Sequence, residues 1–284
     1  MTSASDGTPA QAGPQAGPRT PGAPGLPRSL VAHPAYGPLP GLLLILTVVT
    51  GVVDSISILA LGRVFVANMT GNVVFAGFAI VGAPGFSLSA SLFALAGFLV
   101  GAGFGGTMIT RVGSDRAALL RAGTAGEVAL AAVALVLAEL SGDPGVSHGT
   151  THIVGGTFGP AVTDALAAVL ATAMGIQNAV ARKLAVPDLT TTVLTMTLTG
   201  IGADLRAVLR AGDTHAGATS DLIRRLLAIG TMLAGALAGA SLTLYVSPVS
   251  ALALALSLLA MTAAAAMALA TRPAPWRTPP ARPT

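Results

Sequence analysis

The chain has 284 residues, of which 53% are hydrophobic and only 9% charged, with a formal net charge of +4. Soluble globular domains carry about 25% charged residues, so this composition excludes that class and indicates a polytopic membrane protein. The basic balance does not indicate a nucleic-acid partner, because the arginines lie beside the apolar runs, as in membrane anchoring. The chain contains no cysteine, which excludes disulfides, thiolate metal sites and cysteine nucleophiles.

The two ends of the chain differ from its middle. Residues 1–40 hold nine prolines and no apolar run, and we expect a disordered tail there. Residues 272–284 form a second, short, basic and proline-rich tail. Between the tails we expect two membrane parts joined by an external loop; these are residues 41–140, 141–158 and 159–271.

Eight apolar segments follow one another along the membrane part. Six are long enough to cross a bilayer, which takes about 20 residues, so the predicted fold is an all-α bundle of about six full transmembrane helices. The second and sixth segments are unusually polar, and we expect them to be broken or re-entrant. In order, the segments are 39–62, 64–83, 86–109, 122–140, 159–181, 189–204, 226–246 and 248–271.

The positions of Lys and Arg orient these segments, because cytosolic loops are enriched in both. The loop 141–158 contains neither and is expected to be external. Basic residues lie on both sides of segment 189–204, Arg182 before it and Arg206 after it, so we expect this segment not to cross. Segment 64–83 is expected to behave likewise, which places both chain ends in the cytosol. A full crossing of that segment with an external N-terminus is the alternative.

The two membrane parts share three features in the same order, which indicates an internal repeat. The first is Gly51-Val-Val-Asp54, which corresponds to Gly175-Ile-Gln-Asn178, and the second pairs the polar run 68–72 with the threonine-rich run 190–196. The third is a row of small residues, which lets helix backbones approach closely: Gly97, Gly101 and Gly105 in one half, and Thr231, Gly235 and Gly239 in the other. With three crossings in each half, the halves would be inverted, an arrangement found in transporters.

Polar side chains in these matching stretches form the candidate site, since polar groups are costly in hydrocarbon and mark function by default. Asp54 lies well inside the first helix, where we expect it to serve as a proton site, a cation site or a counter-charge for a cationic substrate. A pair with Arg63 or a neutral, hydrogen-bonded carboxyl is the structural alternative. For the other residues the alternative is hydrogen bonding between helices. The candidate substrate-binding residues are Asp54, Asn68, Thr70, Gly71, Asn72, Gln177, Asn178, Thr191, Thr192 and Thr195.

Two further acids are expected at the membrane surface. Glu127 is placed one turn inside its segment, where it pairs with Arg121 or reaches the cytosolic surface, and Asp164 is placed near the external end of the next segment. The chain has no G-x-S-x-G motif and no phosphate-binding glycine loop. We therefore expect no cofactor, and no enzymatic motif is indicated. His148 and His152 have a spacing that would fit a metal on a helix, but Gly149 lies between them and no third ligand is evident, so we expect no metal.

The run from Gly51 to Asn72, GVVDSISILALGRVFVANMTGN, resembles the signature of the YoaK-like bacterial membrane proteins, a family of unknown function. The stretches 175–179 and 191–195 are similar to that family's second block. The resemblance covers about residues 40–270 and implies a multi-pass protein of the bacterial inner membrane. It implies no particular reaction.

These patterns favour a secondary transporter or permease for a small polar or ionic solute, with its site where the two halves meet near the midplane. There are two alternatives: an intramembrane lipid-handling enzyme that uses Asp54, and a scaffold that transports nothing. The expected partners are the lipid bilayer, the solute and a second copy of the chain, the last bound through the glycine faces of residues 97, 101 and 105 or 235 and 239. The C-terminus is expected in the cytoplasm, and the sequence does not indicate the substrate.

Overall fold

The computed structural model describes residues 36–141, 157–184, 186, 195, 197–202, 216–271 and 273–278, with residues 216–221 described by their backbone alone. Within this part of the chain, six helices are long and apolar enough to cross a membrane. The predicted all-α polytopic bundle is thus confirmed. The six helices are α2 (Leu39–Ala60), α4 (Leu88–Val112), α5 (Arg116–Leu140), α6 (Pro160–Leu184), α8 (Ala216–Tyr245) and α9 (Pro248–Ala270).

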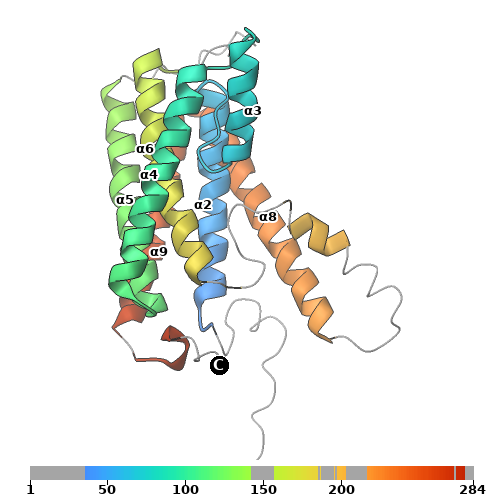
Figure 1. Ribbon diagram of the computed structural model, residues 1–284, viewed down its shortest axis with the longest axis vertical. Coiled ribbons are helices and arrows are strands. Elements are labelled where there is room, and N and C mark those ends of the chain that lie inside the picture. The colour runs from blue at the N-terminus through green and yellow to red at the C-terminus, as the bar shows by residue number, and fades with distance from the viewer. Residues whose placement is uncertain are drawn as a thin grey trace, which may run out of the picture.

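Successive long helices run in alternating directions, and α2 begins at the same end of the bundle at which α9 stops (Figure 1). This end, which we call the basic end, carries Arg111, Arg116, Arg182 and Lys183 in the terminal turns of α4, α5 and α6. A short 3-10 helix, η1 (Pro275–Arg277), lies against the start of α5 there. The other end is called the opposite end below.

The second apolar segment does not cross the bundle. After α2 ends, residues 61–68 turn back into the bundle, and α3 (Met69–Ile80) then returns beside α4 to the opposite end (Figure 1). The reversal begins at Gly62 and Arg63, which both have positive φ angles, +74° and +58°. Only glycine adopts such angles without strain. The twelve residues of α3 are too few to cross, so this segment is re-entrant, as its polar sequence predicts.

The matching segment of the second half lies mostly outside the described residues. Of segment 189–204, the structure describes residues 195 and 197–202, which are helical. The candidate residues Thr191 and Thr192 are not among them.

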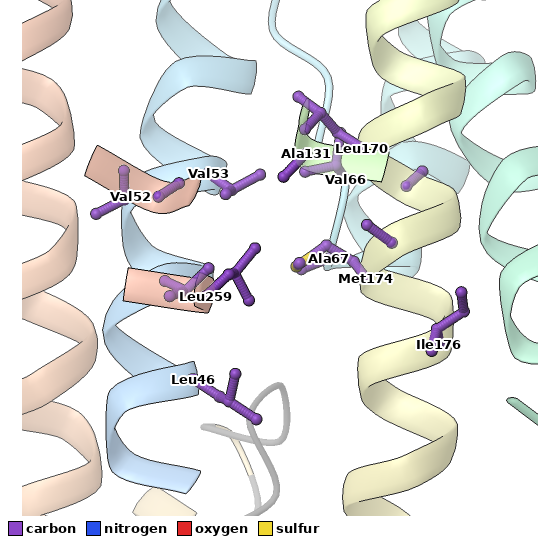
Figure 2. Packing of buried hydrophobic residues seen from close by; sticks show 14 of the residues in the cluster. Leu46, Val52, Val53, Val66, Ala67, Ala131, Leu170, Met174, Ile176 and Leu259 are labelled. Carbon is purple, nitrogen blue, oxygen red and sulfur yellow. The ribbon is translucent and has the colours of Figure 1, made fainter. Parts of the chain in front are cut away.

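Four of the long helices form an inner ring. Helices α2, α9, α5 and α6 each contact the next around the ring, and α6 contacts α2 again. Helix α4 packs outside this ring against α6, and α8 packs outside it against α2. The contact between α2 and α6 is small, because the re-entrant residues Val66 and Ala67 lie between them (Figure 2).

The glycine contacts repeat between the halves. A Cβ added to Gly51 of α2 would lie 3.1 Å from the carbonyl carbon of Gly235 in α8. A Cβ added to Gly175 of α6 would lie 3.1 Å from the carbonyl carbon of Gly101 in α4. The contact between α2 and α8 therefore has the same geometry as the contact between α6 and α4. Because α2 and α6 run in opposite directions (Figure 1), the repeat is inverted.

The same geometry corrects the expectation that these glycine faces bind a second copy. Each face packs against a helix of its own chain, at distances that leave no room even for a methyl group. Sequence alone shows that such faces approach a helix closely but not which helix fills them. The contacts are Gly97 with Ala168, Gly101 with Thr172, Gly105 with Ala179, Gly235 with Val48 and Gly239 with Val52.

Candidate functional site

The re-entrant loop meets an acid inside the bundle. The backbone N–H of Ala67 donates a hydrogen bond to Oδ1 of Asp54 at 3.3 Å. Asp54 itself is half-buried, whereas Val66 and Ala67 are 0% and 4% exposed. An unwound backbone at membrane depth needs partners of this kind, since lipid offers none. Asp54 thus holds the tip of the loop between α2 and α6.

The alternative in which Asp54 pairs with Arg63 is not what the structure shows. The Arg63 guanidinium lies over the ring of Phe86, 5.5 Å from the ring centroid. Such cation–π contacts are worth about 0.5–1 kcal/mol at exposed sites. The arginine therefore holds the loop at the opposite end of the bundle, leaving the Asp54 carboxyl to the loop backbone.

Asn72 fixes the path of the loop. Its Nδ2 donates to the carbonyl oxygen of Phe65 at 2.5 Å, and its Oδ1 accepts from the Phe65 N–H at 2.8 Å. Asn72 is fully buried, and Gly71 leaves the space that the Phe65 ring fills. We therefore assign Asn72 and Gly71 a positioning role. Their neighbours Asn68 and Thr70 are exposed.

The second half contributes an amide to the same interior. Gln177 of α6 donates from Nε2 to Oγ1 of Thr50 in α2 at 2.8 Å. Thr50 lies one helical turn from Asp54, so this bond joins the two halves directly beside the acid. Asn178, the repeat counterpart of Asp54, is half-buried and donates to the carbonyl oxygen of Met174 at 2.8 Å. Thr195 is exposed.

Glu127 was expected at the membrane surface, and the structure shows this to be wrong. Helix α5 begins at Arg116 rather than near residue 122, which places Glu127 about three turns into the helix. Its side chain is 1% exposed. The available signal was Asp115, a good N-cap residue, whose carboxylate accepts hydrogen bonds from the first turn of α5.

Two oxygens in this interior lack hydrogen-bond partners within the described part of the chain, Oε2 of Glu127 and Oε1 of Gln177. Three of the buried threonines on the same ring of helices have hydroxyls that donate to carbonyls of their own helices: Thr50 to Leu46, Thr124 to Leu120 and Thr262 to Leu258. Because each hydroxyl uses its hydrogen within its own helix, its oxygen remains as an acceptor. The interior is therefore rich in hydrogen-bond acceptors. The four ring helices carry basic residues only toward the basic end. Such a site suits cations and hydrogen-bond donors.

These features define a class: a polytopic membrane protein of two inverted halves, with a re-entrant segment that reaches an acid in a polar interior. The family model "Protein of unknown function (DUF1275)" matches residues 42–265, so the chain belongs to the DUF1275 family. The chain is 34% identical over 197 residues to the UPF0700 transmembrane protein YoaK of Bacillus subtilis (strain 168), over 69% of this chain and 80% of that protein. The predicted YoaK-like membership is confirmed. No solved structure matches the chain significantly.

Proposed function

We propose that this protein is a secondary transporter or permease for a small polar or ionic solute, and that the solute is a cation or a neutral hydrogen-bond donor rather than an anion. One observation carries the proposal: a re-entrant backbone, held by Asp54, lies where two inverted halves meet. Broken segments at the contact of inverted repeats are the usual place of transport sites.

The preference for a cation or a donor follows from the charges and donors near the site. Among the described residues, Asp54 and Glu127 are the acids of the interior, and the amide N–H of Ala67, a donor that an anion would use, is taken by Asp54. An anionic solute would face both acids without a nearby basic group in the described ring helices. Like charges at short range in a low-dielectric interior repel strongly.

The proposal places the protein in the bacterial inner membrane with the basic end in the cytoplasm. The arginines of the described residues gather at that end, apart from Arg63, and cytoplasmic loops carry an excess of Lys and Arg. The C-terminal segment 273–278 packs at the basic end and is therefore cytoplasmic in this proposal.

The lipid-handling alternative has less support. A shallow apolar groove of about 360 Å³ on α8 would face lipid, and its lining holds no titratable side chain: Ile223, Leu226, Leu227, Gly230, Thr231 and Ala234. Acid–base catalysis also needs a second group within hydrogen-bond reach. Within the described residues, Asp54 has a backbone amide rather than a titratable side chain as its partner.

The test is electrical recording from proteoliposomes adsorbed on a solid-supported membrane, challenged with a panel of small cations and neutral polar solutes. The wild type should give a current or a solute flux for at least one of them. Asp54→Asn should abolish it, because asparagine keeps an acceptor for Ala67 but loses the charge. Asp164→Asn, near the opposite end, is the matched control and should transport normally. Full activity in Asp54→Asn, with normal protein levels, would sink the proposal.

A separate measurement distinguishes transport from a scaffold role. The chain has no native cysteine, so Thr50→Cys introduces a single thiol beside Asp54. A permease that exposes its site alternately should be labelled there by small impermeant maleimides from each side in turn. Protection from both sides under every solute condition would favour the scaffold.

A further inference from the structure

Glu127 is a buried acid that the proposed role of Asp54 does not use. It lies on the inner stripe of α5 together with Thr124, Ala131 and Ala134, all of which are buried. Ala131, one turn further along the helix, belongs to the same apolar cluster as Val66 at the tip of the re-entrant loop (Figure 2). The Glu127 carboxyl is therefore inside the ring of helices and near the depth that the loop reaches.

No basic side chain of the described residues forms an ion pair with Glu127. Asp54, the charged residue of α2, is held by the loop. The other charged residues on the elements packed around Glu127 lie within about two turns of helix ends: Arg111 on α4, Arg116, Arg121 and Glu139 on α5 itself, Asp164, Arg182 and Lys183 on α6, Arg277 on η1, and none on α9.

A second acceptor without a partner lies at the same level. Gly126, next to Glu127, packs against Ile176, next to Gln177; a Cβ on Gly126 would lie 3.5 Å from the Ile176 side chain. Nε2 of Gln177 donates a hydrogen bond to Oγ1 of Thr50, whereas its Oε1 has no partner within the described part of the chain. A carboxyl and an amide oxygen that are both buried without a hydrogen-bond donor are unfavourable unless a donor or a cation binds to them.

We propose that Glu127 is the binding site of a small monovalent cation, a proton or an alkali ion, and that this ion is the one coupled to transport. Carboxyl and carbonyl oxygens are the ligands that hard cations take, and a proton on the carboxyl removes the same buried charge. The coupling role rests on the proposed function, whereas the binding site itself does not.

The position of Glu127 explains how its occupancy would act on the fold. Helix α5 belongs to the first half of the repeat and α6 to the second, and they meet at Gly123 and Gly126, which pack on Val180 and Ile176. A charge that appears or disappears beside this contact biases the two halves toward different arrangements. An ion shifts a conformational equilibrium only through such differential binding.

Infrared difference spectroscopy on the full-length protein in lipid nanodiscs tests the site without any knowledge of the solute. Spectra are compared across a pH step and, at fixed pH, across addition of Na⁺ or K⁺. A protonated-carboxyl band that changes with pH and is lost in Glu127→Gln identifies the ion as a proton. A carboxylate shift on adding alkali cation that is lost in the same variant identifies an alkali ion. Asp164→Asn, an acid outside the interior, should leave either signal intact.

The proposal is overturned if Glu127→Gln, still monodisperse by size-exclusion chromatography, retains every carboxyl signal of the wild type. If that variant does not fold, Glu127→Asp replaces it, and the band must then move in frequency or in midpoint rather than vanish; an unmoved band overturns the site. Because no solute enters the measurement, a positive result stands even where every transport assay of the wild type fails. Transport with no Glu127 signal leaves the proposed function and removes this ion site.

Discussion

Gly51 of α2 faces Gly235 of α8 so closely that a Cβ on either glycine would overlap the backbone of the other helix. The second half repeats this relationship between Gly175 and Gly101. These two glycine contacts have the same geometry and are related by the inverted repeat. They hold the outer helices α8 and α4 to the inner ring. The backbones touch at these points, so any movement of one half against the other must slide or hinge along the glycine faces.

Substituting Gly101 should therefore weaken the bundle. In Gly101→Ala the new methyl group meets the backbone of α6 at Thr172, which forces the two helices apart. We expect a loss of about 1–3 kcal/mol, as for overpacked interiors, measured by thermal unfolding in detergent. Gly103→Ala, two residues on in the same helix, meets open space and should be neutral or stabilising by up to about 1 kcal/mol. Equal melting temperatures for both variants would contradict this packing.

The sequence predicts the helices of this fold better than their partners. Apolar length predicts the six crossings, and the polar residues of segment 64–83 predict its re-entrant path, because both follow from the cost of polar groups in lipid. The glycine rows predict close approach, but the helix that fills each row depends on the tertiary arrangement. For this reason the expected contact with a second copy was wrong.

The candidate site was predicted only in part, for physical reasons that differ by residue. Asp54 is identifiable because a carboxylate inside an apolar helix is costly wherever it points. The role of Asn72 depends on the path of the loop that returns Phe65 to it, which no local pattern encodes. Glu127 was missed because the polar first turns of α5 hide the true start of the helix. Without that start, the depth of Glu127 in the bundle cannot be predicted.

Asn72 should be required for the re-entrant loop. Asn72→Ala removes both hydrogen bonds to Phe65 and leaves the N–H and C=O of this half-buried residue unpaired; a polar group that is kept from water without a partner costs about 1–3 kcal/mol. We expect a lower melting temperature and faster proteolysis or hydrogen exchange in residues 61–68. Asn68→Ala is the matched control, since Asn68 is exposed and makes no side-chain cap for α3. A loop equally protected in both variants would show that Asn72 does not hold it.

The re-entrant path makes a prediction about membrane sides. Single cysteines at Arg63 and Ser89, which precede and follow α3, should be labelled from the same side of the membrane. Ser114→Cys, in the turn between α4 and α5, should be labelled from the other side. All three positions are exposed, and the chain has no native cysteine to interfere. Labelling of the first two positions from opposite sides would mean that segment 64–83 crosses after all.

The basic end is tied together by a short C-terminal segment. Arg277 of η1 forms an ion pair with Asp115 and donates from Nη1 to the carbonyl oxygen of Ala270 at 3.0 Å. The adjacent Trp276, the only tryptophan of the chain, packs on Gly37 just before α2. Fluorescence of this one residue therefore reports whether the segment is docked.

Acid should release this segment and neutral pH should not. The Arg277 guanidinium, the main influence on Asp115, holds the pKa of that carboxyl below its ordinary value of 3.8. A lowered folded-state pKa means that the pair contributes fully above about pH 4 and is lost as the pH falls through the lower, folded value. Trp276 emission should stay constant near neutrality and shift to the red only in acid. Asp115→Asn, which can still cap α5, should show the shift at neutral pH. An unshifted neutral spectrum in that variant would show that other contacts hold the segment.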